Sequence, residues 1–386
     1  MASLALDKVL DRAASVARDV AAPHAEAVDT DARWPEESLR ALQDAGLGGL
    51  VVPERAGGLG HGLAALAQVC EVLAGACAST AMCFGMHGVG SAVIAAKATE
   101  DQHDRYLHPI VSGHHLTTLT LSEPGTGAHF WLPRSELRQA EGGFVLTGSK
   151  TFVTSGGHAD SYVVSAVDAD AASPVGEFSC VVIDADNPGL EWGASWDGLG
   201  MRGNSSRSVA LHDVALSDAA LLGEPGDQIW YVFNVIAPYF LMAMAGSYLG
   251  VAAGAFEDMR LHVTQRRYSH DGSRLAEQPV VQHRVGELWA KVERTRQLVR
   301  HAAEGGDRGE PWTLPALASA KAEVAECATD VVNGAMTLVG GIGYREHGTL
   351  GRRLRDARAA HVMSPTTDLL RLWTGRAVLD EHILAD

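Results

Sequence analysis

The stretch Arg355-Asp356-Ala357-Arg358-Ala359-Ala360-His361-Val362-Met363-Ser364-Pro365-Thr366-Thr367 decides the fold of this chain. It belongs to a region of helical periodicity that extends from residue 350 to residue 384. An arginine-rich run, Gly351-Arg-Arg-Leu-Arg355, leads into it. Such a run is typical of a solvated or intersubunit helix face, and the alternative is a site for a phosphate-bearing cofactor. The charges alone favour the first interpretation.

Helical periodicity covers both ends of the chain, and a strand-rich segment separates them. Ala and Leu recur at three- and four-residue spacing up to about residue 115, and long helical segments return near residue 227. Between them, short β-branched or aromatic runs are bounded by Gly, Asp, Asn and Pro. We therefore predict an α+β fold with a helical domain (1–115), a β-barrel-like domain (116–226) and a helical bundle (227–386). The expected strands are 117–121, 143–147, 151–154, 161–165, 178–183 and 208–214.

The composition restricts the class of protein. The chain has 386 residues, 46% of them hydrophobic, which is enough for a large core. Its net charge of −16 argues against nucleic acid as a partner, because that binding depends on neutralising phosphates. We expect no membrane span, since the longest apolar runs are interrupted, and no signal peptide or metal site. Five scattered cysteines without a Cys-x-x-Cys pair predict reduced thiols in a cytoplasmic protein.

Three motifs in the strand-rich segment are candidates for chemistry. Gly198-Leu-Gly-Met-Arg-Gly203 has the spacing of a dinucleotide-binding loop, but a strand follows it where such a loop needs a helix. Leu121-Ser-Glu-Pro-Gly-Thr-Gly127 alone would be an ordinary turn. Gly148-Ser-Lys-Thr-Phe-Val-Thr-Ser-Gly-Gly157 alone would be an amphipathic strand. The order of the last two segments, roughly 25 residues apart, favours a shared function.

Together with the C-terminal stretch, these motifs resemble the acyl-CoA dehydrogenase family of flavoenzymes. The resemblance covers almost the entire chain. It implies a three-part fold with a C-terminal four-helix bundle, FAD as the cofactor and a homotetrameric assembly. In most members, a glutamate follows the Arg-Asp-Ala signature eight residues after the Asp and removes the α-proton of the substrate. In this chain that position is Ser364.

The resemblance also implies a set of flavin contacts. Leu121, Ser122 and Gly127 would line the pyrimidine edge of the flavin, although Ala128 and His129 replace the Ser-Asp pair that follows in the family. That replacement changes the expected contacts to the thioester end of the substrate.

Further flavin contacts are implied on other segments. Phe152 would pack on the isoalloxazine ring, and Thr154 would meet flavin N5. Arg266 or Arg267 would bind the pyrophosphate after a small shift in register, because a guanidinium suits phosphate. The other implied contacts are Thr366 and, in a Gly-Gly-x-Gly turn that approaches the cofactor of a neighbouring subunit, Gly340 and Gly341.

The general base of such a dehydrogenase is missing from both of its known positions. Proton abstraction needs a group whose pKa is near the working pH, and a serine hydroxyl cannot act alone. A minority of the family carries the glutamate on an earlier helix, and that position is Phe240 here. His361 and Asp368 could share a helix face with Ser364. We take Ser364 and His361 as the catalytic candidates, although for His361 we favour the interpretation as an ordinary surface or core histidine.

Three functions are compatible with these residues. The first is an FAD-dependent oxidoreductase that dehydrogenates an acyl-CoA or acyl-carrier-protein thioester with an unusual base and passes electrons to an electron-transfer flavoprotein. The second is a flavin-dependent monooxygenase that uses O2 and a flavin reductase. A substrate pocket lined by Phe240, Met242, Met363 and Ala128 would suit either. The third is a non-catalytic or DNA-protecting flavoprotein, against which the acidic charge argues.

Overall fold

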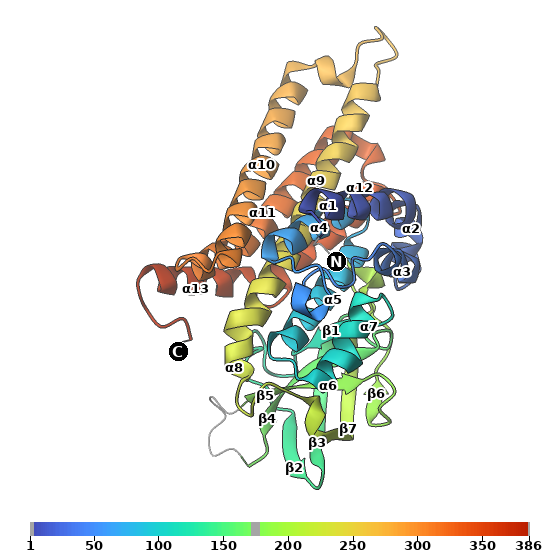
Figure 1. Cartoon of the computed structure of the whole chain (residues 1–386). Coiled ribbons are helices and arrows are strands. Elements are labelled where there is room, and N and C mark those ends of the chain that lie inside the picture. Colours follow the sequence, from blue (N-terminus) through green and yellow to red (C-terminus); the bar gives the residue numbers. More distant parts are fainter. Residues whose placement is uncertain (1–3, 171–177, 385–386) are drawn as a thin grey trace.

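The computed structural model describes residues 4–170 and 178–384. A helical part comes first, a sheet follows, and a long helical bundle completes the chain (Figure 1). The N-terminal helices are α1 (Leu6–Val16), α2 (Ala22–Thr30), α3 (Glu36–Asp44), α4 (Leu63–Ala76), α5 (Ala78–Ala96), α6 (Glu100–Gln102) and α7 (His108–Val111). Helix α5 is buried from Ala78 to Ala95 because it is apolar on all sides, as a central core helix must be.

The middle part is one mixed sheet. Its strands are β1 (Thr117–Thr120), β2 (Glu136–Ala140), β3 (Gly143–Val153), β4 (Ser161–Asp168), β5 (Phe178–Asp184), β6 (Leu190–Trp192), β7 (Arg207–Ser217) and β8 (Leu221–Leu222). The strand order is β6-β7-β3-β2-β4-β5-β8, and β1 pairs with β4. The β1–β4 and β2–β4 pairs are parallel and the other pairs are antiparallel.

Strand β3 differs from its sequence-based prediction. The expected strands 143–147 and 151–154 form a single strand whose pairing with β7 shifts register between Leu146 and Gly148 and again between Lys150 and Val153. These irregularities bend the strand, and each changes the direction of the side chains that follow it. Strands β2, β6 and β8 were not expected, because they are short and carry polar residues or span only two residues.

The C-terminal part is a bundle of long helices. Its helices are α8 (Gln228–Tyr231), α9 (Ala237–Gln265), α10 (Pro279–Asp307), α11 (Thr313–Val339), α12 (Thr349–Val362) and α13 (Thr367–Val378). Helix α9 packs closely on α4 of the N-terminal part. A Cβ atom on Gly246 would lie 2.0 Å from the carbonyl oxygen of Ala67, so only glycine permits this approach.

The periodic region from 350 to 384 is not one helix. It is interrupted at residues 363–366, which we call the Ser364 turn. Pro365 cannot continue a helix, and the Thr366 hydroxyl caps the start of α13 by accepting from the Leu369 amide. Ser364 therefore lies in a turn, and the expected shared helix face with His361 and Asp368 does not exist.

In the part of the chain that the structure describes, two helical segments are long and apolar enough to cross a membrane, which corrects the expectation that no such segment exists. They are Ala78–Ala96 and Gln228–Gln265. Their most apolar windows are 100% and 83% buried inside the protein, as in the core helices of a soluble protein. All five cysteines are free thiols and buried.

Candidate functional site

The Ser364 turn meets the loop that follows β1, residues 121–128. The Ser364 hydroxyl donates to the carbonyl oxygen of Ala128 at 3.3 Å. On another side of the turn, the Tyr248 hydroxyl of α9 donates to the Met363 sulfur at 3.6 Å. The structure therefore brings Ser364, Met363 and Ala128 together.

The 121–128 loop is joined to the end of β3. The amide of Thr151 donates to the carbonyl oxygen of Ser122 at 2.8 Å. Leu121 is buried, Ser122 is half-buried, and Gly127 is exposed with a φ of 56°, in the left-handed region that favours glycine. The two motifs that seemed unremarkable in isolation thus form one structural unit.

A buried ion pair holds this unit together. The Lys150 ammonium contacts Glu123 Oε1 at 2.6 Å and donates to the Ser165 carbonyl oxygen at 2.6 Å. Glu123 also accepts from the amides of Arg134 and Ser135. Burial would raise the pKa of Glu123, but the charge and hydrogen bond of Lys150, with these amides, outweigh burial and lower it. Burial lowers the pKa of Lys150, and the charge and hydrogen bond of Glu123 oppose this effect. The pair fixes the loop to the sheet.

Phe152 presents its ring to solvent from a strained backbone. The residue is 65% exposed and its φ is 55°, which is rare for an aromatic residue. Its ring lies edge-on to that of Trp196, with 6.1 Å between centroids, and the Trp196 indole N–H is buried without a partner in the described structure. Thr154, two residues later, is buried. An exposed aromatic ring is a surface suited to stacking on a flat ligand.

A pocket of about 890 Å³ lies between the bundle and the loop that precedes β7. Leu199, on the same loop as Trp196, forms one wall of the pocket, and α11, α12 and α13 form the others. Its polar lining includes Arg358, His361, Thr366 and Asp368. Arg358 is exposed, and in the described part of the chain it has no ion-pair partner. The pocket thus offers an arginine without an ion-pair partner next to the Ser364 turn, and Asp368 lies on the same lining.

His361 faces this pocket and two threonines. Its Nε2 atom is 3.4 Å from the Thr329 hydroxyl, and its Nδ1 atom is 3.4 Å from the Thr367 hydroxyl. Among the described residues, the hydrogen bonds of His361 and Ser364 do not join them to each other. The two catalytic candidates are therefore close in sequence but are not a hydrogen-bonded pair.

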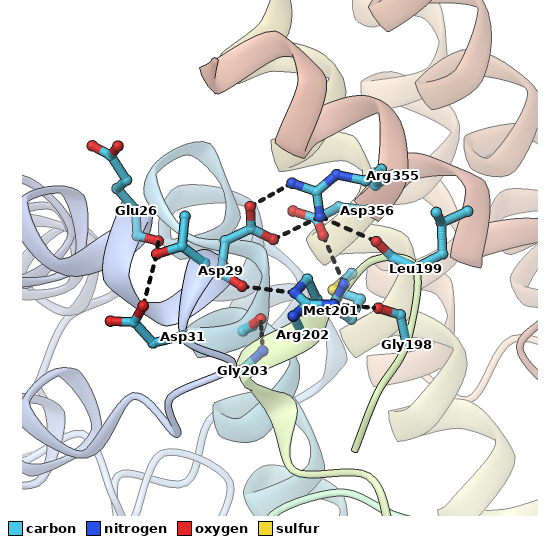
Figure 2. Close-up of polar contacts among 12 residues, drawn as sticks. Glu26, Asp29, Asp31, Gly198, Leu199, Met201, Arg202, Gly203, Arg355 and Asp356 are labelled. Carbon is cyan, nitrogen blue, oxygen red and sulfur yellow. Dashed lines mark hydrogen bonds and ion pairs between the residues drawn. The ribbon is translucent and has the colours of Figure 1, made fainter. Parts of the chain in front are cut away.

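The Arg355-Asp356 pair joins all three parts of the chain (Figure 2). Arg355 forms a two-point ion pair with Asp29 of α2 and donates to the Leu199 carbonyl oxygen at 3.1 Å. Asp356 accepts from the Met201 amide at 2.7 Å, and burial raises the pKa of this carboxyl to about 6. These contacts hold the loop that carries Leu199 against α12.

The glycine-rich loop 198–203 serves this docking. A Cβ atom on Gly200 would lie 2.3 Å from the carbonyl oxygen of Arg355, so the loop needs glycine to approach α12. The sequence-based exclusion of a dinucleotide-binding loop agrees with this arrangement, because a short 3-10 turn and then β7 follow the loop.

The other predicted residues lie elsewhere. Phe240 is half-buried near the start of α9, whereas Met242 is fully buried in the core and does not line an open pocket. Arg266 and Arg267 are exposed where α9 ends, and the Arg267 guanidinium donates to the Gly272 carbonyl oxygen.

Gly340 and Gly341 are also exposed, where α11 ends. The ends of α9 and α11 share a cavity of about 610 Å³, which contains Leu261, His262, Val339 and Ile342. The connection from α9 to α10 lies at the end of the bundle away from the sheet (Figure 1). Within one chain, the predicted arginines and glycines are therefore not part of the pocket beside Ser364.

The arrangement fits a flavin. The exposed Phe152 ring suits an aromatic ring system, and Arg358 suits a diphosphate. The pocket volume is in the range of cofactor sites. Phe152, Thr154, Ser122, Thr366 and Arg358 are the residues that would hold it.

Comparison with known proteins identifies the family. Three family models match in order: the acyl-CoA dehydrogenase N-terminal domain at residues 5–114, the middle domain at 118–214 and the C-terminal domain at 239–379. The probable acyl-CoA dehydrogenase YngJ of Bacillus subtilis (strain 168) is 28% identical over 359 residues, which cover 93% of each chain. The mitochondrial isobutyryl-CoA dehydrogenase of Dictyostelium discoideum is 27% identical over 361 residues, 93% of this chain and 86% of that one. The structure of butyryl-CoA dehydrogenase from Megasphaera elsdenii matches with a TM-score of 0.91 and 26% identity, covering 97% of this chain and 98% of that one. The chain belongs to the acyl-CoA dehydrogenase family.

Proposed function

We propose that the protein is an FAD-dependent oxidoreductase that acts on an acyl thioester. The observation that carries this proposal is the joined unit of the 121–128 loop, the end of β3 and the Ser364 turn. When bound there, FAD would supply the electron acceptor for oxidation of the acyl group. The residues of the chain would bind the cofactor and orient the substrate. The carrier is coenzyme A or an acyl carrier protein.

The reaction we favour is α,β-dehydrogenation with an unusual base. His361 and Asp368 are titratable groups on the pocket wall that could accept a proton, and we favour His361 because Thr329 and Thr367 orient its ring. Glu123 is committed to Lys150, and Asp356 to the Met201 amide, so neither carboxylate is free for proton transfer. An electron-transfer flavoprotein would then accept the electrons.

One observation favours a second candidate, flavin-dependent oxygenation. The Ser364 hydroxyl is bonded to a backbone carbonyl, and its position carries no carboxylate, so a reaction without α-proton abstraction would suit this turn. This candidate needs O2 and electrons from a flavin reductase. Its substrate would be a thioester or another small molecule.

Anaerobic mixing of the oxidised holoenzyme with a panel of acyl thioesters separates the two candidates. Bleaching of the visible flavin absorbance is expected for the dehydrogenase and would exclude a pure oxygenase. Absence of bleaching, with substrate-dependent oxygen uptake after chemical reduction, would exclude the simple dehydrogenase.

Substitution of Ser364 tests whether the turn faces the substrate. Ser364→Glu should create or raise thioester-dependent bleaching at least tenfold, because it restores a carboxylate at this position. Ser364→Gln is the matched control, since it has the same shape and no base. Equal rates in the two variants, with unchanged flavin content, would count against this placement.

We further propose a cytoplasmic homotetramer in which each pocket is completed by a neighbour. Arg266, Arg267, Gly340 and Gly341 are remote from the pocket of their own chain and exposed, as residues that serve a neighbouring pocket would be. Large apolar side chains are exposed around the same helices: Val280, Trp289, Ile342 and Tyr344. Analytical ultracentrifugation tests the assembly, and a monomer that binds FAD with full affinity would contradict it.

A further inference from the structure

Lys321 is a buried lysine that the cofactor site and the proposed reaction leave unexplained. It lies on α11 and has no solvent-accessible surface. Its ammonium donates to the carbonyl oxygens of Ala360 at 2.9 Å, Met363 at 2.9 Å and Pro365 at 2.8 Å. In the described structure its partners are these backbone carbonyls and include no carboxylate. All three belong to the end of α12 or to the Ser364 turn.

The chemistry of this contact matches an ammonium group. A lysine ammonium has three N–H donors and no acceptor, so the three carbonyls satisfy it completely. The end of α12 carries unpaired carbonyls and the negative end of the helix dipole, both of which favour a cation. Burial lowers the pKa of Lys321 to about 7. Without the lysine, three buried carbonyls would converge on an apolar space without a donor.

The contacts of the turn show what this arrangement fixes. Lys321 contacts the backbone on both sides of residue 364, whereas the side chain of Ser364 makes one hydrogen bond, to Ala128. Tyr248 meets only the side chain of Met363. Lys321 therefore holds the backbone at Met363 and Pro365, on both sides of residue 364.

We propose that Lys321 is a positioning residue that holds residue 364 against the 121–128 loop at the edge of the cofactor pocket. It acts through the backbone of the turn and touches neither cofactor nor substrate. The proposal rests on the proposed function only in taking the Ser364 turn as the border of the reacting site.

Hydrogen exchange of the holoenzyme, read by mass spectrometry, tests the structural step. Lys321→Met removes the donors and nearly preserves the volume of the side chain. Exchange in peptides covering residues 361–369 should rise at least tenfold, with the sheet unchanged, and Lys321→Arg should restore part of the protection. The control is Asp307→Asn, which weakens the cap on the amides of Leu63 and Ala64 and should leave the turn unchanged. Unchanged exchange at the turn in Lys321→Met would overturn the proposal. If that variant does not fold, Lys321→Gln replaces it, and exchange equal to wild type would have the same meaning.

A second readout distinguishes positioning from general stability. In the Ser364→Glu background, adding Lys321→Met should lower the limiting rate of flavin bleaching at least tenfold and change the half-saturating thioester concentration less than threefold. Adding Asp307→Asn should change neither. Equal limiting rates with and without Lys321 would overturn the proposal. If none of the thioesters bleaches the flavin of Ser364→Glu, the proposed dehydrogenation fails. The exchange experiment still decides the role of Lys321 in that case.

Discussion

Removing the buried Lys150 should destabilise the protein and release the 121–128 loop. Lys150 is fully buried and the Glu123 side chain is 3% exposed, so Lys150→Met would leave a carboxylate inside the sheet without its cation. Breaking such a pair costs about 3–5 kcal/mol. Glu123 would keep the donors of Arg134 and Ser135, so we expect the lower end, about 3 kcal/mol.

This loss translates into a measurable shift in the melting temperature. Unfolding entropy is about 2.1 cal/mol/K per residue, or about 0.8 kcal/mol/K for the whole chain, so Tm should fall by about 4 °C. The assay is thermal unfolding of the holoenzyme, together with the affinity for FAD, which should also fall because the loop is no longer fixed. Lys291→Met is the matched control, since its ion pair with Asp330 is partly exposed and should contribute at most about 1 kcal/mol.

A double-mutant cycle identifies the pair as the cause. Glu123→Gln with Lys150→Met removes both charges, so the double variant should be less destabilised than the sum of the single variants by at least about 1 kcal/mol. Additive effects, or a loss below about 1 kcal/mol for Lys150→Met alone, would refute the assignment of a structural ion pair to this site.

Three further changes test other parts of the site. Asp356→Asn should flatten the pH dependence of stability between about pH 4 and 6. Because the pKa of Asp356 is raised in the folded state, that state binds more protons in this window, and the wild type loses about 3 kcal/mol of stability as the pH rises. Chemical unfolding of both proteins at several pH values measures the difference. Gly200→Ala should cost about 1–3 kcal/mol through its clash with the Arg355 carbonyl, whereas Gly286→Ala, in an exposed helix position with open space, should stabilise by about 0.5–1 kcal/mol; equal effects in thermal unfolding would contradict the docking role. Arg358→Gln should weaken FAD binding about tenfold by removing this arginine from the pocket, and an unchanged affinity by fluorescence titration would place the diphosphate elsewhere.

The elements that were predictable from the sequence are those with a strong local signal. The periodicity predicts helices at 280–305 and 314–339, and α10 and α11 begin and end within two residues of these bounds, because apolar periodicity over many turns is a local property. The break at the Ser364 turn was missed although Pro365 signals it, since the periodicity on both sides was taken as one helix. The polar strand β2 has no alternation that would reveal it.

The candidate site also has parts with a local sequence signal and parts without one. Ser122, Phe152 and Ser364 were found because each lies in a short motif. Their supporting contacts connect residues far apart in the chain, such as Lys321 with the Ser364 turn and Arg355 with Asp29, 326 residues away. The one local signal for Lys321 was a charged residue inside an apolar helical run from 314 to 322. Arg266 and Gly340 lie away from the pocket of their own chain, so the structure of one chain does not place them in a site.

The contacts of residue 364 explain how this position can differ within the family while the fold is maintained. The backbone of the turn is held by Lys321, and the adjoining loops are held by Lys150 and Arg355, all through groups other than the side chain at 364. The Ser364 hydroxyl contributes one hydrogen bond of 3.3 Å to a half-buried carbonyl, a contact worth about 1 kcal/mol or less. Replacement of a catalytic glutamate here would therefore change the chemistry of the pocket with little effect on stability, because the scaffold that positions the residue does not depend on its side chain.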